Sequence, residues 1–303
     1  VKSIGNAAFS WCSNLTSIEI PSSVTSIGDS AFSGTPWLTN KRQENNSLVI
    51  VNGILIDGRT CSGKVTIPDG VTSIGYNAFD SCTSLTSITI PKSVQSIENN
   101  AFSGCTALTE VLLENGSTLT SESLGVDASI IKTYWNEGDL TWTLTADGTL
   151  TISGSGAMKD YDAGDSPAYR NSNIKKVVIQ EGVTSIGDCA FYNCTGLTSI
   201  TIPDRVTSIG DSAFRNCTGL TSVTIPGSVT SIGECAFQGC SSLTSIEIPS
   251  SVTSIGENAF YNCTGLISIN ILEGVTSIGG SAFSGCTNLI DITIPESLSL
   301  IHI

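Results

Sequence analysis

The strongest constraint on the fold is a 23-residue phrase that recurs between Gly182 and Pro295. Its phenylalanines keep this step from copy to copy, at Phe191, Phe214, Phe237, Phe260 and Phe283. Its valines do the same, at Val183, Val206, Val229, Val252 and Val275. A fixed period in the twenties, with leucine and isoleucine inside it, is typical of a solenoid. One copy cannot bury its own apolar face, so the copies must stack to form a core.

The apolar spacing inside one copy predicts a short strand followed by a turn. Leu220, Val223 and Ile225 follow an L-x-x-L-x-L spacing, which suits a strand with one face inward. Pro226 ends the strand because proline has no N–H to donate. The segment around Phe237 then predicts a short helical or 3₁₀ turn with its apolar side inward. The core is therefore expected to consist of stacked Leu, Ile, Val, Phe and Cys side chains.

The repeated motif SIGxxAFxxCxxLxSIxIPxxVTSIG, first complete in residues 185–210, resembles the BspA-like leucine-rich repeat proteins of bacterial and protist surfaces. Commoner leucine-rich repeats carry Asn or Cys soon after the strand. Here that place holds Arg205, Ser228 or Ser251, and the Cys precedes the strand leucine by three residues. The resemblance covers nearly the whole chain. It implies an α/β repeat solenoid, a right-handed leucine-rich repeat superhelix with one short strand per coil.

Breaks in the period divide the chain. We predict a first leucine-rich repeat array over residues 1–118, with a β-hairpin insertion at about 36–64. Residues 119–134 lose the repeat and are rich in Ser, Thr and Asp, so we predict a linker there. Residues 135–181 are predicted to form an internal β cap, and residues 182–303 form the second array.

Both predicted hairpins have a turn signal between alternating apolar residues. Asn52-Gly53 lies in the middle of residues 48–57, and Asp147-Gly148 lies in the middle of residues 140–152. We expect the first hairpin to project from the edge of the solenoid. We expect the second to cover the first coil of the second array, because the open end of a solenoid is an apolar, unpaired edge.

Eight of the eleven cysteines occupy one position of the repeat, three residues after the phenylalanine: Cys12, Cys82, Cys105, Cys194, Cys217, Cys240, Cys263 and Cys286. They could form disulfides in a secreted protein or act as small buried apolar side chains. The odd total and the spacing of one per coil favour free thiols. Cys189 and Cys235 occupy another position, which we expect near the surface, and Cys61 lies in the insertion.

The composition argues against several classes of partner. The formal net charge is −14, and both phosphates and anionic lipids attract Lys and Arg, so nucleic acid and membrane surfaces are disfavoured. No stretch approaches the roughly 20 apolar residues that span a bilayer. The chain opens inside a repeat, and its last residues, 297–303, form an apolar tail. We therefore expect a piece of a longer or processed protein, or a self-association surface at the tail.

No pattern of catalytic residues is present. The single histidine, His302, is the second-to-last residue, where a general base would not be held in place. The pairs Cys189/Cys194 and Cys235/Cys240 lack the further ligands that a structural zinc site needs. The acidic run 160–165 lacks the final bidentate Glu of a calcium loop. We expect no enzyme, no metal and no cofactor.

The surface offers one candidate binding face, made of the outward strand positions of the second array: Ser199, Thr201, Ser222, Thr224, Ser245, Glu247, Ser268, Asn270, Asp291 and Thr293. Extended regular faces are what repeat proteins use for binding. Equally, Ser and Thr fit β geometry and keep a sheet soluble. The aromatic residues gather instead in the insertion and cap, which are alternative binding places.

The resemblance implies a non-enzymatic module at the cell surface or outside the cell, for protein binding or adhesion to host or other cells. The expected partner is a protein, such as a host extracellular-matrix or surface protein, or a glycan. Nucleic acid and direct membrane insertion are not expected, and the oligomeric state stays open. The alternative is a structural spacer or an accessory module of a larger multidomain surface protein.

Overall fold

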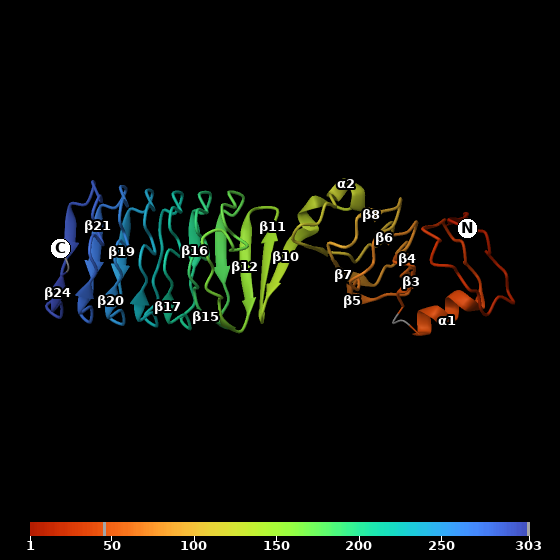
Figure 1. Ribbon diagram of the computed structural model, residues 1–303, viewed down its shortest axis with the longest axis horizontal. Coiled ribbons are helices and arrows are strands. Elements are labelled where there is room, and N and C mark those ends of the chain that lie inside the picture. Colours follow the sequence, from red (N-terminus) through yellow and green to blue (C-terminus); the bar gives the residue numbers. More distant parts are fainter. Residues whose placement is uncertain (45–46, 302–303) are drawn as a thin grey trace. The chain divides into compact units, whose positions relative to one another are not determined.

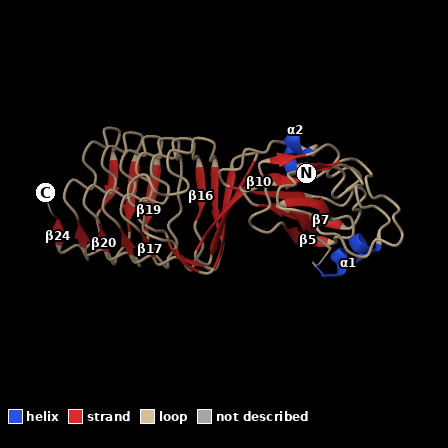
Figure 2. Cartoon of the chain, turned by 45° about the vertical axis from the view of Figure 1, so that its right-hand side comes forward, coloured by secondary structure: helices blue, strands red, loops and turns tan. Residues whose placement is uncertain are grey.

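The computed structural model describes residues 1–44 and 47–301, and the chain forms two compact units, Val1–Tyr134 and Trp135–Ile303 (Figure 1). Both are stacks of β coils, so the predicted leucine-rich repeat solenoid is confirmed. Among the described residues, helix occurs only in the first unit (Figure 2).

Four regular coils of the second unit contribute two short strands each, in place of the single strand that we expected, and the coil of Ser222 has an isolated bridge at the place of its first strand. The predicted strands are β16 (Ser199–Thr201), β19 (Ser245–Ile248), β21 (Ser268–Ile271) and β23 (Asp291–Thr293). Two-residue strands follow in the same coils, at β17 (Ser208–Ile209), β18 (Ser231–Ile232), β20 (Ser254–Ile255), β22 (Ser277–Ile278) and β24 (Leu300–Ile301). All the recorded pairings between these coils are parallel, in steps of one repeat. We call the outward sides of the two sets the long-strand face and the short-strand face.

The segment around each phenylalanine forms hydrogen-bonded turns rather than a helix. Cys235 and Gly239, two residues to either side of Phe237, both have positive φ, of 55° and 73°. Left-handed residues stop a right-handed helix from continuing. The later of these positions holds Asn193, Asn216, Gly239, Asn262 and Gly285 in the five copies. Glycine and asparagine are the residues that adopt this conformation at least cost, which explains why they alternate there.

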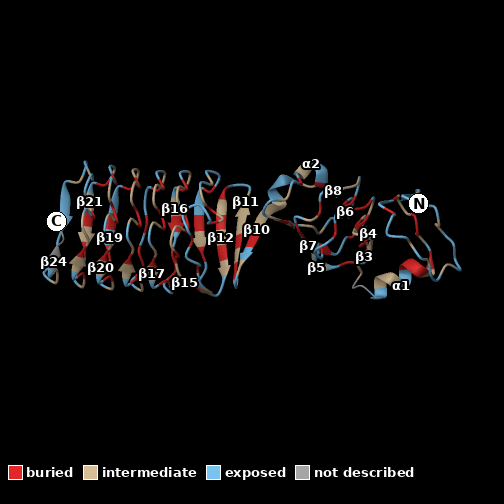
Figure 3. Cartoon of the chain, viewed as in Figure 1, coloured by how far each residue is buried: buried red, intermediate tan, exposed pale blue. Residues whose placement is uncertain are grey.

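The core of the second unit is one continuous stack. The rings of Phe191, Phe214 and Phe237 are fully buried and follow one another at 5.2 Å, with interplanar angles of 11° and 12°. The predicted inward position of Phe237 is confirmed. Figure 3 shows buried positions in each coil of this unit.

A β-hairpin closes the first coil of the second unit, as predicted. β11 (Leu140–Thr145) and β12 (Thr149–Gly154) are antiparallel, and β12 pairs in parallel with β14 (Lys176–Ile179), which in turn pairs with β16. β13 (Gly156–Ala157) pairs with β15 (Val183–Ser185). Trp142 of β11 is fully buried, with its ring 5.7 Å from that of Phe191. The hairpin therefore covers apolar surface that the first coil would otherwise expose.

The first unit contains β1 (Ser3–Ile4), β2 (Ser26–Ile27), α1 (Pro36–Glu44), β3 (Val49–Val51), β4 (Ile54–Asp57), β5 (Gly63–Thr66), β6 (Ser73–Ile74), β7 (Leu85–Ile90), β8 (Ser96–Ile97) and β9 (Glu110–Glu114). β5, β7 and β9 are parallel long strands, and β4, β6 and β8 are parallel short ones.

The insertion contains the predicted hairpin, β3 and β4, with Asn52 and Gly53 both at positive φ. The prediction that it projects from the solenoid is wrong, because β4 pairs with β6 and takes the place of a short strand. The helix α1 was not predicted. The Thr35 hydroxyl accepts a hydrogen bond from the N–H of Leu38 at 3.2 Å, which is a helix-capping contact.

The segment predicted as a linker, 119–134, packs against the last coil of the first unit. It holds α2 (Ser121–Leu124), η1 (Ala128–Ile130) and the first part of β10 (Ile131–Glu137). Leu119 and Leu124 are buried, and Ile131 to Tyr134 pair in parallel with β9. These residues therefore cover the end of that stack.

All eleven cysteines are free thiols. Five repeated cysteines, Cys105, Cys217, Cys240, Cys263 and Cys286, donate to the backbone carbonyl of the preceding coil's phenylalanine, as from Cys217 Sγ to Phe191 O at 3.1 Å. Cys61 occupies the same position of its coil, because Cys82 Sγ donates to the carbonyl of Gly58 at 3.6 Å, as the other cysteines donate to the phenylalanine of the preceding coil. Gly58 lies three residues before Cys61, in the place of a phenylalanine. Our assignment of Cys61 to an irregular insertion is thus corrected.

Candidate binding surface

The ten predicted residues lie on the long-strand face in two rows, one beginning at Ser199 and one at Thr201. The recorded pairs are Ser199 with Ser222, Ser245 with Ser268, Ser268 with Asp291, Glu247 with Asn270, and Asn270 with Thr293. Ser199, Ser268 and Asn270 are half-buried, and the other seven are exposed. The structure thus brings the set together on one side of the coil stack.

Alternation along the strands produces this face. Successive side chains of a strand point to opposite sides of the sheet. The residues between the two rows, such as Ile246 and Ile269, point inward and are 4% and 2% exposed. Hydroxyl, amide and carboxylate groups are therefore left outside on a backbone that the core holds in place.

The hydroxyl groups of the second unit are used in two ways. Threonines that directly precede a strand bond to the backbone of the preceding coil, as on the long-strand side, where Thr198 Oγ1 donates to Lys175 O at 2.9 Å and Thr221 Oγ1 donates to Thr198 O at 3.2 Å. On the short-strand face, Thr207 Oγ1 donates to Thr184 O at 3.3 Å, and Thr230 Oγ1 donates to Thr207 O at 3.1 Å. On the long-strand face, one side-chain hydrogen bond joins predicted residues, from Asn270 Nδ2 to Glu247 Oε2 at 3.0 Å. Within the described part of the chain, the other eight members of the set make no side-chain hydrogen bond: Ser199, Thr201, Ser222, Thr224, Ser245, Ser268, Asp291 and Thr293. Their donors and acceptors remain available to a ligand.

The corresponding row in the first unit is occupied by internal contacts. Lys132 Nζ lies 2.6 Å from Glu110 Oε1, and Ser87 Oγ donates to Glu110 Oε2 at 2.9 Å. The hydrogen bond from Lys132 is the main reason why the pKa of Glu110 is lowered. Ser87 occupies an outward strand position, yet it is only 5% exposed and its hydroxyl is bound to Glu110.

The buried repeated cysteines do not have the character of nucleophiles. Burial raises the pKa of Cys194 to about 12 and that of Cys105 to about 11. A thiol reacts as its thiolate, so these groups stay neutral and inert near pH 7. His302, the single imidazole, lies outside the described residues.

Within residues 1–44 and 47–301, no cluster of three or more His, Cys, Asp or Glu side chains is arranged to bind a metal ion. Over the same residues, no helix has the length and apolar character to span a bilayer. Asp160, from the acidic run, uses its carboxylate to accept a hydrogen bond from the N–H of Asp188 at 3.1 Å.

A second surface feature was missed at the sequence level. Arg170 lies over the ring of Tyr169 at 5.1 Å, Arg215 lies over Tyr192 at 5.7 Å, and the two tyrosine rings are 5.7 Å apart. Tyr192 and Arg215 both directly follow the repeated phenylalanine, so a comparison of that position between copies would have found part of this row. Tyrosine and arginine are enriched where protein interfaces bind most strongly.

The chain matches the family model described as BspA type leucine rich repeat region (6 copies), over residues 1–55, 58–130, 165–263 and 207–302. No curated protein matches it.

Three solved structures are similar. A leucine rich cell surface protein from Faecalibacterium prausnitzii A2-165 is 33% identical, with a TM-score of 0.41, and the match covers 98% of this chain and 70% of that one. A leucine-rich repeat protein from Bacteroides ovatus ATCC 8483 is 28% identical, with a TM-score of 0.47 and coverage of 98% and 71%. The T. pallidum leucine rich repeat protein is 29% identical, with a TM-score of 0.43 and coverage of 54% and 83%.

Proposed function

Because this chain belongs to the BspA-type leucine-rich repeat family, we propose that it is a non-catalytic binding module that attaches to a protein through its long-strand face. The observation that carries the proposal is the set of exposed side chains that make no hydrogen bond to any described residue, at Thr201, Ser222, Thr224, Ser245, Asp291 and Thr293. The threonines that directly precede the strands on either face, such as Thr198 and Thr207, bond to the backbone of the preceding coil instead.

Variation among the repeats supports the same face. The outward position that holds Thr201 and Thr224 holds Glu247, Asn270 and Thr293 in the following coils. The threonine of the short-strand face is unchanged from Thr184 through Thr276. Side chains that vary while the backbone beneath them repeats give each part of the face its own pattern of charge and hydrogen bonding. A specific partner requires such a pattern.

We propose that the module works outside the cell or at its surface, in adhesion to host or other cells. Support comes from the F. prausnitzii relative, whose description is that of a cell surface protein. The negative charge of the chain, −14, favours a partner with exposed basic groups. Glycans are the second class of partner, since the face presents hydroxyl and amide groups.

The test is a binding screen over immobilised extracellular-matrix proteins, plasma proteins and glycans. It compares the native chain with the double variant Thr201→Lys, Thr224→Lys. The matched control is Thr207→Lys, Thr230→Lys, which adds the same charge to the same coils on the short-strand face. We expect saturable binding that falls at least about tenfold in the first variant, because two long cations would displace a docked surface, and stays within about twofold in the control.

Two outcomes would redirect the proposal. Equal binding by both variants would move the site to the Tyr169–Arg215 row or the cap. No binding to any surface would favour the alternative of a spacer or accessory module, whose role depends on the domains that it carries.

A further inference from the structure

The coil of Phe32 in the first unit lacks a long strand. In the coil of Phe32, the residues at the strand position, 38–43, are part of α1. The next coil supplies β5, which pairs with β7 on one side, and among the described strands none pairs with its other side. Within residues 1–44 and 47–301, the sheet of parallel long strands in this unit therefore has a free edge at β5.

The free edge of β5 carries unpaired backbone groups. The N–H of Ile67 donates to Thr89 O of β7 at 2.9 Å. Successive residues of a strand direct their N–H and C=O groups to opposite sides. Thr66 and Lys64 therefore direct theirs away from β7. Such an edge is a template for a further strand.

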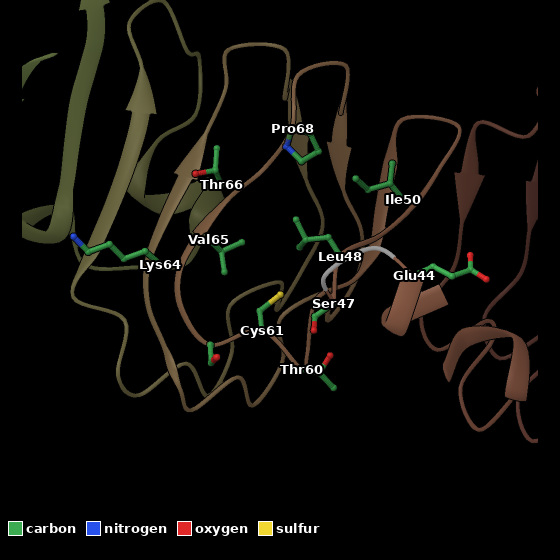
Figure 4. A pocket seen from close by; sticks show the side chains of 11 residues that line it. Glu44, Ser47, Leu48, Ile50, Thr60, Cys61, Lys64, Val65, Thr66 and Pro68 are labelled. Carbon is green, nitrogen blue, oxygen red and sulfur yellow. The ribbon is translucent and has the colours of Figure 1, made fainter. Parts of the chain in front are cut away.

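A cavity lies beside this edge (Figure 4). Its volume is about 720 Å³, within the range of sites that hold ligands. Leu48, Ile50 and Val65 give it an apolar lining, and all three are only half-buried. Lys64 and Thr66 lie on β5, and Pro68 follows the end of that strand (Figure 4). The cavity thus combines apolar side chains with a strand edge that lacks a partner.

The charge of Lys64 favours a ligand that carries a carboxylate. Lys64 is exposed and forms no ion pair with any residue that the structure describes. Glu110, the acid of the same row, is already bound to Lys132. A carboxylate brought in beside β5 would meet an unpaired ammonium group.

We propose that the edge of β5 binds an extended segment of a partner protein, which adds as a strand where the coil of Phe32 has none. The segment places apolar side chains at alternate positions against Leu48, Ile50 and Val65. Its backbone pairs with Thr66, and a carboxylate between the apolar residues reaches Lys64. This site is separate from the long-strand face of the second unit.

The chain itself suggests the probe. Lys64 lies opposite Ser87 in the sheet, and Asp291 occupies the Ser87 position of its own coil. The peptide Leu-Ile-Asp-Ile-Thr-Ile-Pro, a copy of residues 289–295, therefore combines the strand pattern with a suitably placed acid. Its fluorescein conjugate would be titrated with the full chain, and binding followed by fluorescence anisotropy.

Two variants at one position separate backbone pairing from side-chain contact. Thr66→Pro removes the outward N–H, and we expect binding to weaken about tenfold or more. Thr66→Val keeps that N–H, so binding should stay within about twofold. The change Lys64→Glu in the protein, or Lys in place of Asp in the peptide, should each weaken binding when made alone. Making both changes together exchanges the charges and should restore binding.

A modified peptide keeps the test valid if Thr66→Pro perturbs the fold. N-methylation at the residue whose N–H faces β5 should abolish binding, whereas N-methylation of the adjacent residue should leave it. No saturable binding, or binding that Thr66→Pro and both N-methylated peptides leave unchanged, would overturn the proposal. The long-strand-face variant Thr201→Lys, Thr224→Lys should bind the peptide normally, so failure of the first proposal would not affect this one.

Discussion

The two units are built from the same repeat, but their cores are continuous to different degrees. In the second unit, one cluster of buried side chains runs from Trp135 to Ala282. In the first, the buried residues fall into two clusters, one ending at Ile54 and one beginning at Leu55. The division coincides with the insertion.

The phenylalanine position explains the difference. In the first unit, Phe32 packs against Trp37, with ring centroids 4.5 Å apart, and the next coil has Gly58 in place of a phenylalanine. Phe79 fills this space, because a Cβ at Gly58 would collide with its ring. An insertion can therefore be accommodated in a solenoid, but the ring stack that joins successive coils is interrupted there.

The largest expected effect is on the continuous core. Phe237→Ala should lower the free energy of unfolding of the second unit by about 3–5 kcal/mol, because it opens a cavity between two neighbouring rings. Urea unfolding monitored by tryptophan fluorescence measures the loss. Phe9→Ala is the matched change in the first unit; Phe9 is half-buried and stacks on one ring, so its loss should be less than half as large. A loss under about 1 kcal/mol for Phe237→Ala would contradict the importance of the stack.

The second-largest expected effect is on the stability of the insertion, where the carboxylate of Asp57 joins α1 to β4. Asp57 is 1% exposed and accepts hydrogen bonds from Arg42 Nε at 2.8 Å and Arg59 Nε at 2.9 Å. The hydrogen bond to Asp57 is the main reason that the pKa of Arg42 is raised. Asp57→Asn should destabilise the insertion by about 2–3 kcal/mol, since two partly exposed guanidinium groups lose their carboxylate.

Hydrogen exchange over residues 36–58 measures this effect locally. The control is Lys41→Gln, which removes the exposed pair between Lys41 and Glu44 and should cost under about 1 kcal/mol. If both variants exchanged alike, the buried carboxylate would not be what joins α1 to β4.

The smallest expected effect is the loss of stability at alkaline pH that a buried cysteine thiol causes. Burial raises the pKa of Cys263 to about 12, above its ordinary value near 9, so folding favours the neutral thiol. The stability that this shift contributes is fully present below about pH 9 and is lost as the pH rises from about 9 towards 12. Between pH 8 and 10, the second unit should lose about 1 kcal/mol for this thiol.

The variant Cys263→Ala should lack that share of the alkaline loss, although it is less stable than the native chain at every pH. Urea midpoints at pH 8, 9 and 10 provide the comparison. An identical pH dependence in both proteins would mean that the thiol ionises in the folded state as readily as in the unfolded chain. Exposed Cys12 provides a labelling control, since it should react with a thiol reagent before any buried cysteine.

Much of the fold was predictable because the repeat is local and regular. The inward residues of the second unit, the cap hairpin over residues 140–152 and the hairpin at Asn52-Gly53 follow from periodicity and turn residues alone. The left-handed positions beside each phenylalanine were also visible, in the alternation of Asn and Gly at Asn216 and Gly239, but we did not use that signal. The candidate face was predicted as a geometric set, and its role in binding stays a prediction.

The sequence by itself determined the period, the buried side of each coil and the stacking of identical side chains, because these depend on spacing within 23 residues. Only the tertiary structure decided how the irregular segments join the stack. It showed that β4 replaces a short strand, that residues 119–134 cover the last coil of the first unit, and that β5 is left with a free edge. These features depend on pairing between distant residues, and a residue's place in the repeat does not specify which coil lies beside it.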